Sequence, residues 1–256
     1  MGRVRAKTIA TFLDAEFMGE NIMLHGVSPK SQPSWGTLAF SIDRIMRDPF
    51  CEDKADDMCL ITSEFESDSG RWCPVCQIKH PNPKLAFVQA FNKFFAKEPK
   101  NQVGEGCHFG PGTVIGNAGF GFAYDEDGRA HRMPHIGGVI IGDRVEVGSN
   151  TVIDSGVLLP TTIGDDVKID NLVHVAHNVH IGARTLVVAH AMIGGSAWIG
   201  MDCWIGAGAL IRNKAYIGAN VFVGMGANVV KDIEEDGVVV MGNPARVIRR
   251  RTSEDH

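Results

Sequence analysis

Three histidines fall within seven positions, in the segment Val173-His-Val-Ala-His-Asn-Val-His180. Imidazole side chains ordinarily titrate near neutral pH, so a histidine held in a cleft is suited to be a general base. In the repeat described next, Val175 and Val179 point inward, which places His174, His177 and His180 on the outside. A single surface histidine needs no function. Three of them on one outer surface favour proton-transfer chemistry at this place.

The element that positions these histidines is a six-residue repeat. Twelve aliphatic residues stand six apart without interruption, and the residue four places after each is small or β-branched. The twelve are Ile163, Ile169, Val175, Ile181, Val187, Ile193, Ile199, Ile205, Ile211, Ile217, Val223 and Val229. This period is typical of a parallel β-helix, in which each short strand and its turn form one side of a prism-like coil. The interior is then filled by aliphatic side chains, so a site must lie on an outer face or between subunits.

The repeat covers only part of the chain. Residues 1–100 lack it and predict a small α/β domain, with helices expected over residues 8–17 and 83–97 and a strand over residues 57–62. We expect an all-β-dominated β-helix domain over residues 101–233, interrupted by a projecting loop at 116–135. Residues 234–256 form a C-terminal tail. The register slips by two residues before Ile163 and then holds.

Composition narrows the class of protein. The 256 residues carry a net charge of -5, which gives no electrostatic reason to expect a nucleic-acid partner. No run of 18 apolar residues exists, so we expect no membrane span, and the N-terminus lacks the apolar run of a signal peptide. The sequence therefore predicts a cytoplasmic protein.

Cysteine usage points the same way. Cys73-Pro-Val-Cys76 with His80 resembles half of a zinc site, but a second pair at ligand spacing is absent from the sequence. We expect reduced, mostly buried thiols and no metal.

One outward column of the repeat is apolar, although solvent-exposed repeats would be polar there. Its members are Leu186, Met192, Trp198, Trp204, Leu210, Tyr216 and Phe222. Such a surface predicts a covering partner, most simply further copies of the chain in a cyclic homotrimer. The column passes over all three faces of the prism, so it does not identify the face that pairs.

Several motifs carry a resemblance to a known family. Residues 119–123 (GFGFA), 136–142 (IGGVIIG), 150–154 (NTVID) and 168–178 (KIDNLVHVAHN) resemble the UDP-3-O-acylglucosamine N-acyltransferase of lipid A synthesis. Residues 25–29, 36–40 and 82–87 resemble that enzyme's N-terminal nucleotide-binding domain. The resemblance implies a left-handed β-helix, a trimer with active sites between subunits, and acyl transfer from a thioester to the amine of a nucleotide-linked sugar.

Residue roles follow from the resemblance position by position. His177 matches the catalytic base, and Gly195, eighteen residues on, matches the glycine whose backbone N–H forms the oxyanion hole. Both roles make chemical sense, because a protonated amine cannot attack a thioester and a tetrahedral oxyanion needs a fixed donor. The substrate-binding residues implied are Phe40, Asp43, Phe120, Phe122, His174 and Asn178.

This sequence also departs from the family. Asp43 and Met46 stand where relatives hold the uracil with an asparagine and an aromatic residue, and Lys214 replaces a second histidine. Several coils and the helical C-terminal extension are missing. The ending, residues 242–251 (GNPARVIRRR), resembles the tail of coenzyme-A-dependent sugar acetyltransferases. We therefore expect cofactor contacts from Lys214, Asn243, Pro244 and Arg246, although the basic tail is equally consistent with a solvated surface.

The favoured hypothesis is an N-acyltransferase, using acyl-CoA and in particular acetyl-CoA, that acts on a nucleotide-activated amino sugar for surface glycan synthesis. The alternative is the lipid A reaction itself, with a 3-hydroxyacyl chain on acyl-carrier protein. Two further alternatives stay open. One is a zinc-dependent γ-type carbonic anhydrase built on interface histidines, and the other is a solenoid without catalytic activity.

Overall fold

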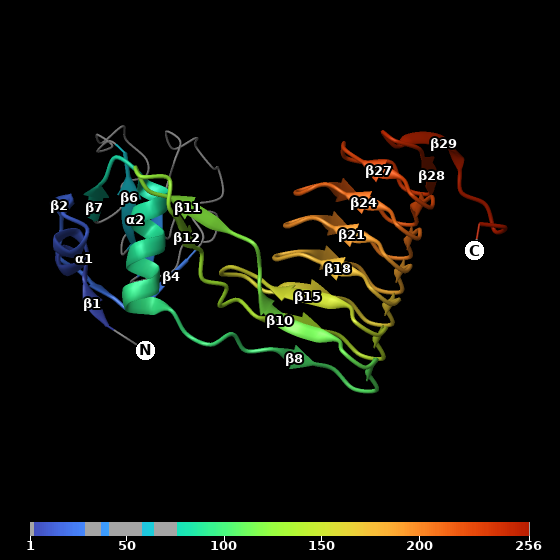
Figure 1. Ribbon diagram of the computed structural model, residues 1–256, viewed down its shortest axis with the longest axis horizontal. Coiled ribbons are helices and arrows are strands. Elements are labelled where there is room, and N and C mark those ends of the chain that lie inside the picture. Colours follow the sequence, from blue (N-terminus) through green and yellow to red (C-terminus); the bar gives the residue numbers. More distant parts are fainter. Residues whose placement is uncertain (1–2, 29–36, 41–57, 64–75, 256) are drawn as a thin grey trace. The chain divides into compact units, whose positions relative to one another are not determined.

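The computed structural model describes residues 3–28, 37–40, 58–63 and 76–255. They divide into two compact units (Figure 1). The first comprises the chain up to Lys97 together with Gly121–Pro134, and the second comprises Glu98–Phe120 and His135 onward. Two separate hydrophobic cores are expected from this division, because each unit must bury its own apolar faces.

The first unit is built on a five-stranded sheet in the order β2-β7-β6-β5-β4. β2 pairs antiparallel with β7, and the other neighbours are parallel. Strands β5 and β6 are buried along almost their whole length, as the central strands of a parallel sheet should be. The strands are β1 (Val4–Arg5), β2 (Glu16–Gly19), β3 (Met23–Leu24), β4 (Gly26–Val27), β5 (Thr37–Phe40), β6 (Met58–Thr62) and β7 (Cys76–Lys79).

Two helices accompany this sheet, α1 (Ala6–Phe12) and α2 (Pro83–Ala90). The α2 N-terminus follows from the sequence: the Asn82 side chain accepts the Leu85 N–H at 3.1 Å, and proline occupies the first turn. The helix expected over residues 83–97 is therefore confirmed in its start. Its end differs, because the last turn, Phe91–Phe95, is π-helical. The helix expected over 8–17 is shorter and begins earlier, since residues 16–19 pair instead with β7.

The segment expected to project from the β-helix contains a hairpin. Strands β11 (Phe122–Tyr124) and β12 (Ala130–Arg132) pair antiparallel and belong to the first unit. The Asp125 carboxylate closes the turn, where it accepts the Arg129 N–H at 2.8 Å and contacts His131 Nε2 at 2.8 Å. These bonds hold the pKa of Asp125 below its usual value, chiefly through the His131 contact.

The second unit is a parallel β-helix with three sheets (Figure 1). The first sheet contains β8 (Gln102–Val103), β13 (Val139–Ile141), β16 (Thr161–Ile163), β19 (His180–Ile181), β22 (Trp198–Ile199) and β25 (Tyr216–Ile217). The second contains β9 (His108–Phe109), β14 (Glu146–Val147), β17 (Lys168–Ile169), β20 (Leu186–Val187), β23 (Trp204–Ile205), β26 (Phe222–Val223), β28 (Val238–Met241) and the antiparallel β29 (Arg246–Arg250). The third contains β10 (Val114–Ala118), β15 (Val152–Ser155), β18 (His174–Val175), β21 (Met192–Ile193), β24 (Leu210–Ile211) and β27 (Asn228–Val229).

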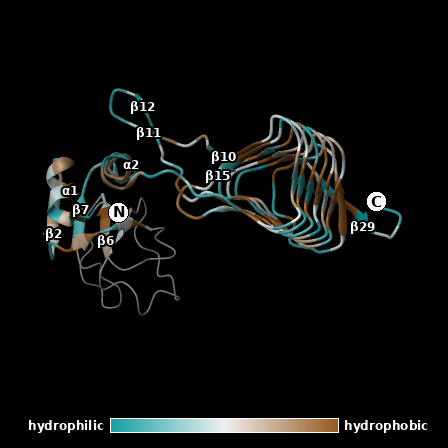
Figure 2. Cartoon of the chain, turned by 90° about the horizontal axis from the view of Figure 1, so that it is seen from below, coloured by the Kyte–Doolittle hydropathy of each residue, from teal (hydrophilic) through white to brown (hydrophobic). Residues whose placement is uncertain are grey.

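The six-residue period positions the core as predicted. All twelve aliphatic residues of the repeat are at most 3 % exposed, and they form one continuous cluster along the stack. Viewed in Figure 2, the successive coils lie over one another around this interior. Burial of each isoleucine or valine contributes about 1.5–3 kcal/mol against the entropy of ordering the chain. Neighbouring coils supply the partners, so the array is stable only as a whole.

The corners between sheets repeat a second pattern. A turn residue with φ near +60° recurs from coil to coil, as at Asn178 (φ 59°), Ser196 (φ 60°) and Lys214 (φ 59°). Side-chain oxygens of Asn or Asp then accept a backbone N–H from the preceding coil. One example is Ser149 N–H to Asn171 Oδ1 at 2.7 Å. These bonds satisfy amides that the two-residue strands leave without a ladder partner.

Candidate active site on one corner of the prism

His177 lies in the corner that joins the third sheet to the first, between β18 and β19. We call this line of turns, residues 154–160, 176–179, 194–197 and 212–215, the His177 corner. Val175 and Val179 are buried on either side, and the turn between them carries His177 outward to a half-buried position. The outward orientation predicted from the repeat is therefore confirmed.

Asn178 fixes which nitrogen of His177 carries the proton. Asn178 Nδ2 donates to the Leu159 carbonyl at 2.7 Å, and Asn178 Oδ1 accepts the Val157 N–H at 3.0 Å. The amide is thus held with its oxygen toward His177 Nδ1, 3.1 Å away. An oxygen can only accept, so Nδ1 must be the donor. The neutral imidazole then has its lone pair on Nε2, which is the tautomer a general base requires.

Gly195 lies one coil further along the same corner, beside the His177 ring. A Cβ atom built on Gly195 would lie 2.8 Å from His177 Nε2 and 2.9 Å from Cε1, closer than real Cβ atoms approach. Only glycine therefore permits the imidazole to occupy this place. The Gly195 backbone N–H donates to Asn213 Oδ1 at 2.9 Å. The sequence brings the predicted base and the predicted oxyanion donor together, with Asn213 beside them.

A second imidazole packs against His177. The His135 ring is 5 % exposed, and its centroid lies 5.3 Å from that of His177 at an interplanar angle of 65°. Gly119 allows this contact, because a Cβ there would lie 2.8 Å from His135 Nε2 and 3.0 Å from His177 Cβ. Within the second unit, the chain before the hairpin and the chain after it thus both meet His177. Sequence reasoning did not place His135 beside His177. The one signal in the sequence is the position of His135, directly before the register of the repeat resumes.

The other two histidines of the segment face different surroundings. His174 Nε2 lies 3.6 Å from Oδ2 of Asp154, a carboxylate that is only 4 % exposed. His180 stacks on Trp198 at 3.7 Å between ring centroids, and its Nδ1 lies 2.7 Å from Thr162 Oγ1. Burial lowers the pKa of His180. Within one chain, the three imidazoles are not grouped as ligands of one metal ion.

The predicted substrate-binding residues belong to both units. In the first unit, Phe40 packs on Phe87 of α2 at 4.7 Å between ring centroids, and the Arg132 guanidinium lies 4.8 Å over the Phe122 ring. In the second unit, Phe120 is 85 % exposed. Asn178 contacts the imidazole of His177. Asp43 lies outside the described residues.

The predicted cofactor-binding residues fall on two different corners. Lys214 is exposed on the His177 corner, in the turn between β24 and β25. Asn243 and Pro244 follow β28 of the second sheet, where Asn243 Oδ1 accepts from Asn228 Nδ2 at 3.1 Å. Arg246 is exposed and its guanidinium donates to the neighbouring Ala245 carbonyl. No contact between Lys214 and this turn is formed among the described residues.

Three of the four described cysteines are buried thiols. Cys59 and Cys76 are register partners on β6 and β7, both are buried, and Cys203 is also buried. The hydrogen bond to Cys76, together with burial, raises the pKa of the Cys59 thiol. Cys76 therefore faces a strand neighbour inside the core, whereas Cys73 and Cys51 lie outside the described residues. In the described part of the chain, no three His, Cys, Asp or Glu side chains are grouped so as to hold a metal ion.

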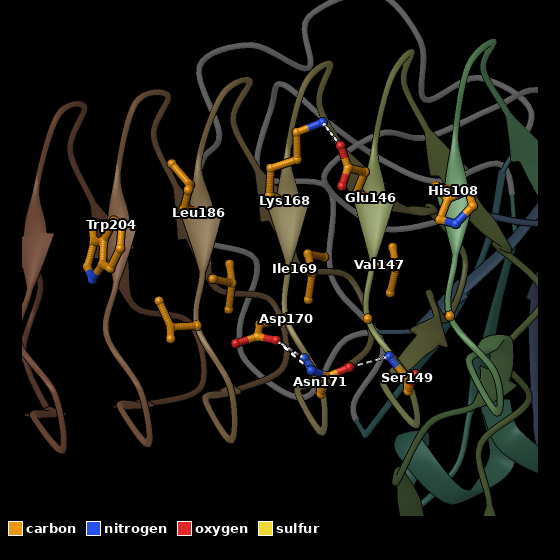
Figure 3. Close-up of a pocket in the computed structure, with 14 residues that line it drawn as sticks. His108, Glu146, Val147, Ser149, Lys168, Ile169, Asp170, Asn171, Leu186 and Trp204 are labelled. Atoms are coloured by element: carbon orange, nitrogen blue, oxygen red, sulfur yellow. Dashed lines mark hydrogen bonds and ion pairs between the residues drawn. The ribbon is translucent and has the colours of Figure 1, made fainter. Parts of the chain in front are cut away.

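A hollow on the second unit lies elsewhere. It has a volume of about 490 Å³ and follows the outer face of the second sheet (Figure 3). A Lys168–Glu146 ion pair of 2.7 Å crosses it, and His108, Leu186 and Trp204 continue the same row. The hollow contains none of the predicted site residues.

None of the described helices is long and apolar enough to cross a membrane.

Comparison with known proteins places this geometry in a class. The family model for bacterial transferase hexapeptide repeats matches residues 160–195 and 196–231. The solved structure of a UDP-N-acetylglucosamine acyltransferase aligns with a TM-score of 0.54 at 16% identity, covering 88% of this chain and 72% of that one. The O-acyltransferase from Moraxella catarrhalis aligns with a TM-score of 0.51 at 22% identity, over 60% and 58% of the two chains. The fold is that of the left-handed β-helix acyltransferases, which confirms the predicted fold class and handedness.

More specific likenesses are confined to part of the chain. The UDP-3-O-acylglucosamine N-acyltransferase of Methylococcus capsulatus is 49% identical over 74 residues, 29% of this chain and 21% of that protein. The enzyme of the same name from Leptospira biflexa is 55% identical over 64 residues, 25% of this chain and 18% of the relative. The chain thus spans about a fifth of the length of these curated relatives. The resemblance predicted from the motifs is confirmed over this region.

Proposed function

We propose that the protein transfers an acyl group from a thioester to the amine of a UDP-linked amino sugar. The observation that carries the proposal is the pair formed by His177 and Gly195. The hydrogen bond from Nδ1 to Asn178 leaves the lone pair of His177 on Nε2, and Gly195 lies beside that nitrogen. This arrangement provides a base and an amide donor one coil apart.

In the proposed reaction, the sugar amine attacks the carbonyl carbon of the thioester while His177 Nε2 takes one amine proton. A new C–N bond forms, and the carbonyl oxygen becomes an oxyanion stabilised by the Gly195 N–H. The C–S bond then breaks, and the departing thiolate receives the proton from the imidazolium. The products are an amide and a free thiol. Base catalysis of this kind contributes about 10²–10⁴ in rate.

For the acceptor and the donor we propose the lipid A reaction, which the sequence offered as the alternative. The curated relatives are named UDP-3-O-acylglucosamine N-acyltransferases. Within one chain, the residues expected to hold coenzyme A lie on two different corners. We therefore propose UDP-3-O-acylglucosamine as acceptor and 3-hydroxyacyl-acyl-carrier protein as donor, in preference to acetyl-CoA.

The proposal also covers the nucleotide-binding unit, the oligomeric state and the cellular compartment. The first unit, with Phe40 on its buried sheet, is proposed to bind the nucleotide. The apolar residues on the outer surface, among them Trp198 at 49 % exposed and Tyr216 at 45 %, support a homotrimer that covers part of them. Because nucleotide sugars and acyl-carrier protein are cytoplasmic substrates, we propose that the reaction takes place in the cytoplasm.

In the experiment, the purified full chain is incubated with UDP-3-O-acylglucosamine and either 3-hydroxyacyl-acyl-carrier protein or acetyl-CoA. The amide product is detected by mass spectrometry. We expect amide formation with the acyl-carrier protein at a kcat/KM at least tenfold above that with acetyl-CoA, a margin of about 1.4 kcal/mol in transition-state binding. Preferential turnover of acetyl-CoA would instead identify acetyl-CoA as the acyl donor. No amide with any UDP-amino sugar and either donor would refute the proposed function.

A further inference from the structure

The backbone N–H that the proposed reaction needs is already engaged. Gly195 donates to the Oδ1 atom of Asn213, which lies one coil further along the His177 corner, at 2.9 Å. The same kind of bond caps turns elsewhere in the β-helix. Glu105 N–H donates to Asp143 at 2.8 Å, and Ala219 N–H donates to Asp236 at 2.7 Å. Taken alone, the Asn213 bond would be one more turn cap.

The surroundings of Gly195 set this bond apart from the other caps. Gly195 is buried, with the His177 imidazole against it, and the Asn213 carboxamide engages its N–H. An oxyanion is stabilised by donors 2.7–3.1 Å away. Asn213 Oδ1 stands at that distance from the Gly195 nitrogen. A thioester oxygen and the Asn213 oxygen would therefore compete for one N–H.

We infer that Asn213 is a gating residue, whose carboxamide occupies the oxyanion position at rest and turns away when the acyl donor enters. This inference rests on the proposed acyl transfer. Asn213 is exposed, so its side chain can rotate toward solvent without leaving a cavity. Asn213 thus acts through Gly195: it holds the amide in place at rest and releases it to the carbonyl of the thioester.

Two substitutions separate gating from a purely structural cap. Asn213→Ala removes the competitor, so the KM for the acyl donor should fall by about two- to tenfold, the range expected for one neutral hydrogen bond. Asn213→Asp places a carboxylate on the same N–H, where it binds more strongly and repels an oxyanion. We expect it to lower kcat/KM for the donor by at least about tenfold. The KM for the sugar should be unchanged in both variants.

Both variants are expected to fold. Aspartate accepts the same kind of backbone N–H at Asp143 and Asp236, on the corner between the first and second sheets, so a cap of this type tolerates a carboxylate. The matched control is Asn171→Ala, which removes the cap from Ser149 N–H in a turn between the second and third sheets. It should lower Tm by about as much as Asn213→Ala does and leave all kinetic constants unchanged.

The measurement is steady-state kinetics of the full chain with 3-hydroxyacyl-acyl-carrier protein as the varied donor, together with thermal melting. A fall in donor KM for Asn213→Ala and a loss of kcat/KM for Asn213→Asp support gating. Loss of activity in Asn213→Ala, or wild-type kinetics in Asn213→Asp, would overturn it. A wild-type chain that forms no amide would instead refute the proposed function, and the gate with it, so the two failures are distinguishable.

Discussion

At the scale of single residues, the site depends on side chains that hold one another in place. Asn178 selects the tautomer of His177, and Gly195 leaves room for the imidazole beside its own amide. The three groups come from two neighbouring coils and need no mobile loop to meet. A base whose proton position and ring position are both fixed loses little entropy on reaching the transition state.

Gly195→Ala tests the space that the ring occupies. The added methyl group would lie 2.8 Å from Nε2, so the imidazole must swing toward solvent. Because a displacement of about 1 Å in a catalytic group typically costs about 100-fold in rate, we expect kcat to fall by about that factor. The melting temperature should change little, since the half-buried ring can turn toward solvent once the methyl group displaces it. A variant with wild-type kcat would show that the ring does not need its observed position.

At the scale of elements, the sequence predicts the scaffold better than the site. Period six determines which residues point inward, and all twelve repeat positions are buried accordingly. The contacts of Asn178 with Leu159 and of Asn213 with Gly195 depend on register across coils and on side-chain rotamers, which periodicity does not contain. His135 reaches His177 across 42 positions of the sequence, and no six-residue spacing predicts that contact. The π-helical turn after α2 has no signal that we identified in the sequence.

The first sheet carries a pH-dependent element. His180 stacks on Trp198, and burial lowers its pKa below the usual 6.5. Unfolded chains bind this proton more readily than the native protein, so stability is full above about pH 6.5 and is lost as the pH falls toward the lowered pKa. We expect His180→Gln to weaken this loss.

Urea unfolding at pH 8 and pH 5.5 measures the effect on the free energy of unfolding. Wild type should lose more stability between the two values than His180→Gln does. Gln retains a polar group opposite Thr162, whose Oγ1 lies 2.7 Å from His180 Nδ1. Identical losses in the two proteins would assign the pH dependence to other groups.

At the scale of the whole molecule, the β-helix presents apolar residues on all three outer sheets. Trp198 and Tyr216 lie on the first, Leu186 on the second and Leu210 on the third, and each is at least 39 % exposed. The distribution over three faces agrees with the outward column read from the sequence. An array of this kind is stable as a solenoid, and apolar residues gathered on its outer surface indicate that a partner covers them.

Association of three chains is therefore expected in solution. Light scattering coupled to size exclusion should give a mass about three times the 27.7 kDa of one chain. Apolar burial between copies drives such association, so the species should persist in salt concentrations that screen surface charge. A single monomeric species at micromolar concentration would contradict the trimer and leave the outer apolar residues without an explanation.

The most direct test of the base role compares wild type with His177→Ala, using UDP-3-O-acylglucosamine, 3-hydroxyacyl-acyl-carrier protein and mass-spectrometric detection of the amide. We expect kcat to fall by at least about 10², with the melting temperature and the KM for the sugar unchanged, because only proton removal in the transition state is lost. An equally active His177→Ala variant would contradict proton transfer at this imidazole.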